Sequence, residues 1–163
     1  MNDNSTLIVH SISREVRRVP ANWQHPCRDN GSYIPLLDGY NYDIESWNEG
    51  NQQWEAGYVK YYGNPDDRVA TEWIAKTEIH AGFSYTEWAG PCPKQKNYIP
   101  DWPDEERTHW QMYETVSEGT PVSPVMDSRD ALARWLSDNR ASLWGKIIAS
   151  YEEWLEIIDA KTI

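Results

Sequence analysis

The sequence predicts a single α+β domain over residues 1–163, in which three or four helices cover a small antiparallel sheet. Apolar and polar residues alternate near the N-terminus and again over residues 109–116, a pattern typical of strands. Apolar residues recur at helical spacing near the C-terminus. Only 28 of the 163 residues are Leu, Ile, Val or Phe, so the ten Trp and ten Tyr are expected to build much of the core.

The N-terminal quarter is predicted to contain the first strands of this sheet. Residues 1–6 are expected to be disordered, and one or two strands follow over residues 7–19. Residues 20–39 are rich in Pro and Gly and are predicted to form an ordered, irregular segment.

The middle of the chain is predicted to be largely helical. Asp43 is a candidate cap for a helix that ends near Gly57, because Ile44, Trp47 and Trp54 share one face. Residues 70–77 also show helical spacing, after Asp66 and Asp67. Residues 82–103 hold many prolines and are expected to be a loop with little regular structure.

The C-terminal third carries the clearest pattern. One helical turn at residues 103–106 is expected to lead into a strand that ends near residue 116. A helix over residues 129–139 is predicted to be capped by Asp127 or Ser128, and a second helix is predicted over residues 142–159.

The charge of the chain excludes several classes of partner. Its formal net charge is −11, which argues against direct binding of nucleic acid or anionic lipid. The acidity lies after residue 40 and serves either solubility or the docking of a basic partner. No run of 18 apolar residues occurs and the N-terminus has no basic segment of a signal peptide, so we expect a protein of the cytosol.

Neither a metal nor a cofactor is predicted. His25, Cys27, His80 and Cys92 are residue types that bind zinc, but the paired C-x₂-C spacing is absent and both cysteines are expected to be free thiols. The sequence has no glycine-rich phosphate loop, and Ser123 lies outside a G-x-S-x-G motif. Binding without catalysis is therefore favoured, although abundant acids and aromatic residues leave a glycosidase-like cleft open.

Several motifs resemble a widespread group of uncharacterised bacteriophage and prophage proteins. The segments that carry the resemblance are R-R-V-P at residues 17–20 with Trp23, His25 and Pro26, P-D-W-P at residues 100–103, E-G-T-P-V-S-P at residues 118–124, L-A-R-W-L at residues 132–136 and Y-E-E-W-L at residues 151–155. The resemblance implies a phage origin and supplies no catalytic residue. It leaves out residues 63–89, which are a possible insertion particular to this chain.

The candidate binding residues are aromatic and polar side chains beside Gly- and Pro-rich turns. Trp and Tyr stack on flat ligands or fill pockets of a partner, although most such rings are expected to form the core. The candidates are Arg17, Arg18, Trp23, His25, Trp102, Trp110, Tyr113, Glu118, Thr120 and Ser123.

Three functions fit these observations. The first is a phage-encoded acidic accessory protein that binds and inhibits a host factor in the host cytosol, such as a component of antiviral defence. The second is an aromatic pocket that sequesters a nucleotide-type small molecule, with phosphate held by Arg14, Arg17, Arg18 and Arg28. The third is a component of the virion or of its assembly.

Overall fold

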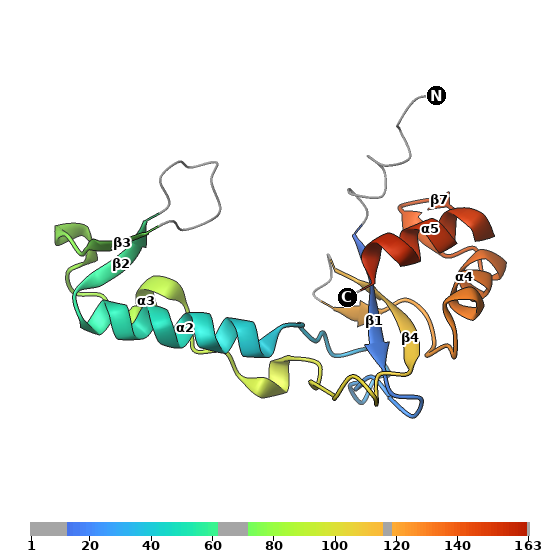
Figure 1. Cartoon of the computed structure of the whole chain (residues 1–163), viewed down its shortest axis with the longest axis horizontal. Helices are drawn as coiled ribbons and strands as arrows, with labels where there is room; N and C mark the ends of the chain where they lie inside the picture. The colour runs from blue at the N-terminus through green and yellow to red at the C-terminus, as the bar shows by residue number, and fades with distance from the viewer. Residues whose placement is uncertain (1–12, 62–71, 116–118, 163) are drawn as a thin grey trace, which may run out of the picture. The chain divides into compact units, whose positions relative to one another are not determined.

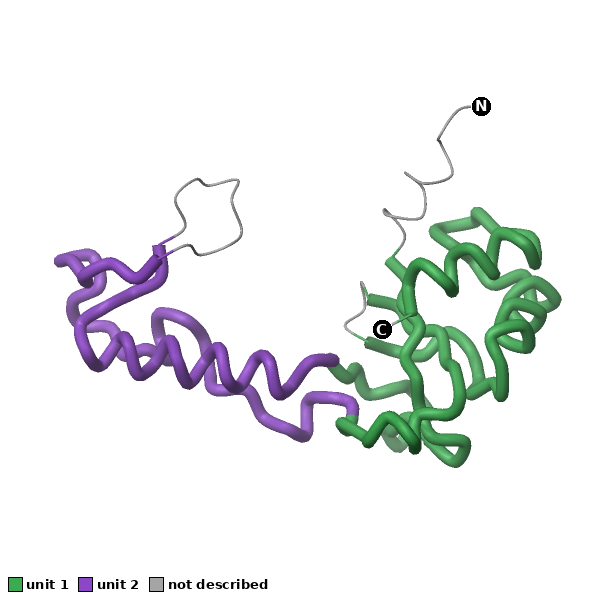
Figure 2. The backbone as a smooth tube through the Cα atoms, viewed as in Figure 1, with its two compact units in different colours: residues 1–37, 100–163 green, residues 38–99 purple. Residues whose placement is uncertain are grey.

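The computed structural model describes residues 13–61, 72–115 and 119–162, which group into two compact units (Figure 2). Unit 1 combines Met1–Leu37 with Pro100–Ile163, and unit 2 is Asp38–Ile99. The expected disorder of residues 1–6 lies outside the described residues, as does part of the possible insertion at residues 63–89. One domain over residues 1–163 stays a prediction, because two compact units of one chain can still unfold together.

The sheet of unit 1 confirms the predicted α+β class. Strands β1 (Arg14–Val19), β4 (His109–Glu114) and β5 (Thr120–Pro121) lie in the order β1-β4-β5 (Figure 1). The predicted N-terminal strand and the strand after residue 108 pair antiparallel, with Val16 opposite Met112. Successive side chains point to opposite faces, so this pairing gives the sheet two different faces.

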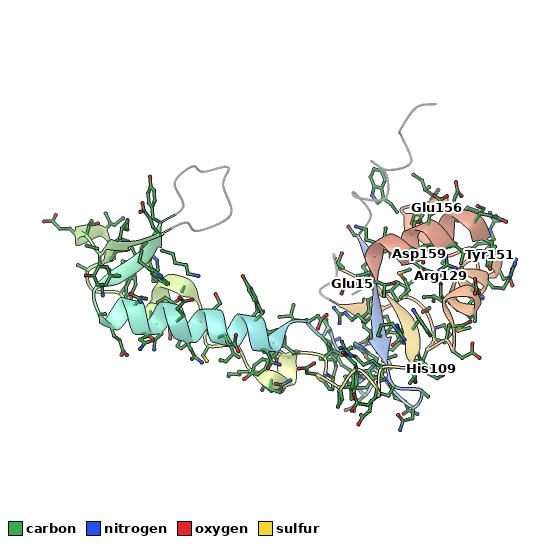
Figure 3. The ribbon with its side chains drawn as sticks, viewed as in Figure 1. Glu15, His109, Arg129, Tyr151, Glu156 and Asp159 are labelled. Carbon is green, nitrogen blue, oxygen red and sulfur yellow. The ribbon has the colours of Figure 1, made fainter. Side chains whose placement is uncertain are left out.

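One face of the sheet packs on the hydrophobic core of unit 1. Helices α4 (Arg129–Asp138) and α5 (Tyr151–Lys161) cover Val16 and Met112, and Trp154 of α5 is fully buried there. The predicted cap Ser128 begins α4, since its hydroxyl accepts a hydrogen bond from the Ala131 amide at 3.0 Å. Figure 3 shows Arg129 beside Asp159, and a guanidinium–carboxylate bond of 2.6 Å joins the two helices.

The predicted helix over residues 142–159 is wrong in its first half. Helix α5 begins only at Tyr151, where Ser150 and Glu153 form a capping box. The preceding residues form a hairpin of β6 (Ser142–Trp144) and β7 (Ile147–Ile148), which turns at Gly145 with φ 55°. The apolar spacing suited a helix, but the Gly145 turn and the Ser150 cap separate the two elements.

Unit 2 is built on a long helix and a two-stranded hairpin. Helix α2 (Tyr40–Glu55) confirms the helix expected there, and strands β2 (Tyr58–Tyr61) and β3 (Glu72–Ala75) pair antiparallel after it. The helix begins at Tyr40, after the N-cap residue Gly39, so Asp43 lies within the first turn and does not cap it. Trp54 is the buried aromatic residue of α2, and the rings of Trp88 and His80 lie 5.7 and 5.8 Å from it.

Two further predictions for unit 2 are wrong. The described part of residues 70–77 contains strand β3, because Trp73 and Ile74 pair across the hairpin with Lys60 and Val59. The segment expected to be a loop contains a 3-10 turn η2 (Gln95–Asn97) and the short helix α3 (Tyr85–Ala89). A capping box of Ser84 and Glu87 begins α3, and that spacing is visible in the sequence. A further 3-10 turn η1 (Glu78–His80) precedes α3.

Gly119 is required by a close approach of two backbone segments in unit 1. Its φ is 96°, and the Leu36 amide donates a hydrogen bond of 3.1 Å to the Gly119 carbonyl. An added Cβ would overlap the Leu36 carbonyl, which belongs to the backbone and cannot rotate away. Gly31 also has a positive φ, of 84°, but no atom lies within 4 Å of an added Cβ.

We therefore expect Gly119→Ala to lower the free energy of unfolding by about 3 kcal/mol, through overlap as well as backbone strain. Gly31→Ala is the matched control and is expected to cost only about 1 kcal/mol, from strain alone. Urea denaturation of both variants measures the difference. Equal losses would contradict the close approach of Gly119 to Leu36.

Candidate functional site

The second face of the unit 1 sheet carries a polar and aromatic cluster centred on the Tyr113 hydroxyl. Trp23 donates its indole N–H to this oxygen at 3.1 Å, and the His25 Nδ1 lies 3.0 Å from it. Tyr113 donates to the Gln111 side-chain oxygen at 3.0 Å. We call the set the Tyr113 cluster, and its members are Arg17, Trp23, His25, Tyr33, Trp102, Gln111 and Tyr113.

His25 is held as a neutral ring within this cluster. Burial is the largest effect and lowers its pKa, the charge of Arg17 acts in the same direction, and the bond to the Ile34 carbonyl opposes both. The Nε2 atom donates to the Ile34 carbonyl oxygen, 2.6 Å away, because that oxygen can only accept. In the neutral ring Nδ1 is then an acceptor, so the single proton of the Tyr113 hydroxyl lies between two acceptors, His25 Nδ1 and the Gln111 side-chain oxygen. Burial likewise raises the pKa of Tyr113 to about 12, so its hydroxyl stays protonated at neutral pH.

Arg17 and Arg18 are bound to the protein's own groups. The buried Arg17 side chain lies 2.6 Å from the Glu15 carboxylate, donates to the Leu36 carbonyl at 2.8 Å and packs over the Tyr113 ring. Arg18 stacks on the Trp110 ring at 3.7 Å and donates to the Arg107 carbonyl at 3.0 Å. Burial is the main cause of a lowered pKa of Arg18. Both guanidinium groups therefore have a structural role on the sheet.

The candidate binding residues predicted from the sequence do not form one site. Arg17, Trp23, His25, Trp102 and Tyr113 come together in the Tyr113 cluster, and Ser123 joins it because Gln111 donates to the Ser123 carbonyl at 2.9 Å. Trp110 and Arg18 lie on the opposite face of the sheet, since they alternate with cluster residues along β4 and β1. Thr120 pairs with Glu114 in β5, and Glu118 lies outside the described residues.

The Tyr113 cluster is a set of hydrogen bonds that holds two segments on the sheet. Among the described residues, no group of three or more His, Cys, Asp or Glu side chains is placed to bind a metal ion. The described cysteines, Cys27 and Cys92, are unpaired, and His80 accepts a bond from the Thr77 amide at 2.9 Å within η1. The hydrogen bonds of the cluster therefore position the segments of the chain that carry Trp23 and His25.

A pocket of about 490 Å³ lies entirely within unit 2. Helix α2 supplies one wall, strands β2 and β3 supply a second, and α3 with the segment after it supplies a third. The lining includes five aromatic residues and two prolines, and polar atoms supply most of its accessible surface. We call this the unit 2 pocket, and its lining residues are Asp43, Ser46, Trp47, Gly50, Val59, Lys60, Trp73, Tyr85, Trp88, Ala89, Pro91, Pro93 and Tyr98.

Gly50 lets the Tyr85 ring pack directly against the backbone of helix α2. Glycine within a helix costs about 1 kcal/mol relative to alanine. Here an added Cβ would overlap the Tyr85 hydroxyl, so the missing side chain makes room for that ring. The Tyr85 ring then lies 5.2 Å from Trp47, whose indole donates to the Gly90 carbonyl at 3.0 Å. The pocket wall is thus built and held by specific contacts.

Two charged side chains line the unit 2 pocket. The Asp43 carboxylate accepts the Tyr98 hydroxyl at 2.8 Å, and burial followed by this bond raises the pKa of Tyr98 to about 12. Lys60 lies opposite Trp73 in the hairpin, with its Nζ 5.3 Å from the centre of that ring. A ligand in the pocket would meet aromatic faces, one carboxylate and one ammonium group.

The sequence predictions did not include this pocket. Trp47 was assigned to the apolar stripe of a helix, and Trp73 to a helix that is a strand. A usable signal was Gly50 within an otherwise helical pattern, because such a glycine often marks a close contact.

No protein-family model, curated protein or solved structure matches the chain significantly. Every helix in the described residues is too short or too polar to cross a bilayer.

We expect the Tyr113 hydroxyl to stabilise the folded state of the protein. In Tyr113→Phe, the Trp23 indole and the Gln111 side chain lose a buried partner, so the free energy of unfolding should fall by about 2 kcal/mol. Tyr33→Phe is the control, because the half-exposed Tyr33 hydroxyl has no hydrogen bond within the described residues. Equal stabilities of the two variants in thermal and urea unfolding would refute the role of this hydrogen-bond set.

Proposed function

We propose that the protein acts by binding and without catalysis, and that it sequesters a small, flat molecule of the nucleotide type in the unit 2 pocket. The phage resemblance suggests the setting, in which removal of a host signal by a small accessory protein would counter antiviral defence. The single observation that carries the proposal is the aromatic lining of the pocket. Its volume lies within the range of about 300–1,000 Å³ typical of small-molecule sites.

The chemistry of the lining favours a flat ring system. Trp and Tyr offer wide, rigid faces that lose little conformational freedom on binding, and nucleobases stack on such faces. The pocket is lined by Trp47, Trp73, Tyr85, Trp88 and Tyr98.

Titration calorimetry against a panel of nucleosides and nucleotides tests the proposal. We expect micromolar or tighter binding of at least one member, at one site per chain. Trp73→Ala should weaken it by about 1–3 kcal/mol, the range for loss of one stacked base. Trp144→Ala is the matched control, since Trp144 is an exposed Trp of unit 1, outside the pocket. Failure of the whole panel to bind would overturn the proposal.

Inhibition of a host protein is the second candidate function, and the β6–β7 hairpin favours it. Trp144, Ile147 and Ile148 of this hairpin are 76%, 54% and 42% exposed. Exposed Trp side chains are frequent anchors of protein interfaces. With a net charge of −11 on the chain, we propose a host protein with a basic surface as the partner, attracted by charge and anchored by the hairpin.

Affinity capture from the bacterial host tests this second candidate with the same pair of variants. We expect one basic protein to bind in a fixed ratio at low salt, to be released as salt rises and to lose its activity when bound. Trp144→Ala should abolish the capture, and Trp73→Ala should leave it unchanged. Capture that survives Trp144→Ala, or no stoichiometric partner at low salt, would contradict the hairpin as the anchor.

A further inference from the structure

We infer that the unit 2 pocket is selective for an anionic ligand of the nucleoside monophosphate class, and that Lys60 binds its phosphate. The inference rests on the proposed function and adds to it the charge of the ligand and the residue that recognises it. Four observations support the inference. Lys60 lines the pocket, and its ammonium group has no ion pair among the described residues. The arginines predicted to bind phosphate are bonded to groups of the protein itself, and Asp43 lines the same pocket as Lys60.

Lys60 is fixed at the pocket by the hairpin register. It pairs directly with Trp73 across β2 and β3, so both side chains leave the hairpin on the same face. Both also line the pocket, and the Nζ atom lies 5.3 Å from the Trp73 ring centre. The ammonium group is therefore held beside an aromatic face on which a base or sugar can pack.

The Lys60 ammonium has no ion pair among the residues that the structure describes. The ion pairs found there belong to Arg14, Arg17, Arg107 and Arg129, all in unit 1. Lys60 is half-buried and lines the cavity, and a cation without an ion pair can bind an anion. Lys76 also lies over a Trp ring, at 4.3 Å from Trp54, but it does not line the pocket.

The arginines that the sequence predicts to bind phosphate are hydrogen-bonded to other groups of unit 1. Arg14 donates to the Ser142 carbonyl and contacts Glu114, and Arg28 donates to the Tyr33 carbonyl. Arg17 and Arg18 hold backbone carbonyls and aromatic rings, as described above. Phosphate recognition in the pocket therefore depends on a lysine of unit 2.

Asp43 gives the pocket a second, opposite charge. It lies in the first turn of α2, whereas Lys60 lies on the strand that follows the last turn. Asp43 and Gly50 both line the pocket and are seven positions apart, which is about 10 Å along a helix. A carboxylate accepts bonds from amino or hydroxyl groups and repels phosphate. The lining thus offers an acceptor for donor groups of the ligand as well as a cation for its phosphate.

The experiment compares the four ribonucleoside 5′-monophosphates with the four matching nucleosides, by calorimetry on the full chain. We expect the wild-type protein to bind at least one monophosphate about tenfold or more tightly than its nucleoside, with an advantage that shrinks as salt rises. Lys60→Gln should remove this advantage, so that a monophosphate and its nucleoside bind with equal affinity. Lys76→Gln, the matched control, should retain it. Both variants keep a long polar side chain, and their melting curves report whether unit 2 still folds.

The outcomes separate this inference from the proposed function. Equal affinity for a nucleoside and its monophosphate, or an unchanged preference in Lys60→Gln, overturns the role of Lys60 and leaves the aromatic pocket standing. Loss of the preference in Lys76→Gln as well as in Lys60→Gln also overturns it, because a general loss of positive charge would then be the cause. No binding of any nucleoside or monophosphate overturns the proposed function itself.

Discussion

The structure of unit 1 depends on the antiparallel pairing of β1 with β4. Because side chains alternate between the two faces of a strand, this one register sends Val16 and Met112 to the helices and Arg17, Gln111 and Tyr113 to the other side. A shift by one residue would bury Arg17 and Gln111 in the apolar core and expose its aliphatic side chains. The register therefore determines both the core under α4 and α5 and the hydrogen bonds that hold Trp23 and His25.

The core of unit 2 is built mainly from aromatic rings. It has few buried aliphatic residues in its described part, and its rings pack around Trp54 with edge and stacked contacts. A two-stranded hairpin is marginal alone, so β2 and β3 depend on packing against other elements. The unit 2 pocket lies among the rings of Trp47, Tyr85 and Trp88, of which Trp47 and Tyr85 lie 5.2 Å apart. The same aromatic composition thus supplies the core and the candidate binding surface.

The two proposed functions use different parts of the chain. Capture of a small ligand uses the concave, aromatic lining in unit 2, whereas inhibition of a host protein uses the exposed hairpin tip in unit 1. Neither requires a reacting group, and burial shifts both titratable members of the Tyr113 cluster toward their neutral forms, by lowering the pKa of His25 and raising that of Tyr113. An accessory protein can combine both activities, because residues on separate compact units can change independently.

The sequence by itself determined the elements whose signals are local: the alternation of β1 and β4, a cap at Asp127 or Ser128 before α4, and the apolar stripe of α2. It also placed Trp23, His25 and Tyr113 among ten candidate residues, but their meeting at one hydroxyl is a result of the tertiary structure. Only the tertiary structure decided that Trp73 lies in a strand, that residues before Ser150 form a hairpin, and that Trp110 faces away from Tyr113. Spacing along a chain records which side chains share a face, but strand pairing and a cavity arise from segments distant in sequence.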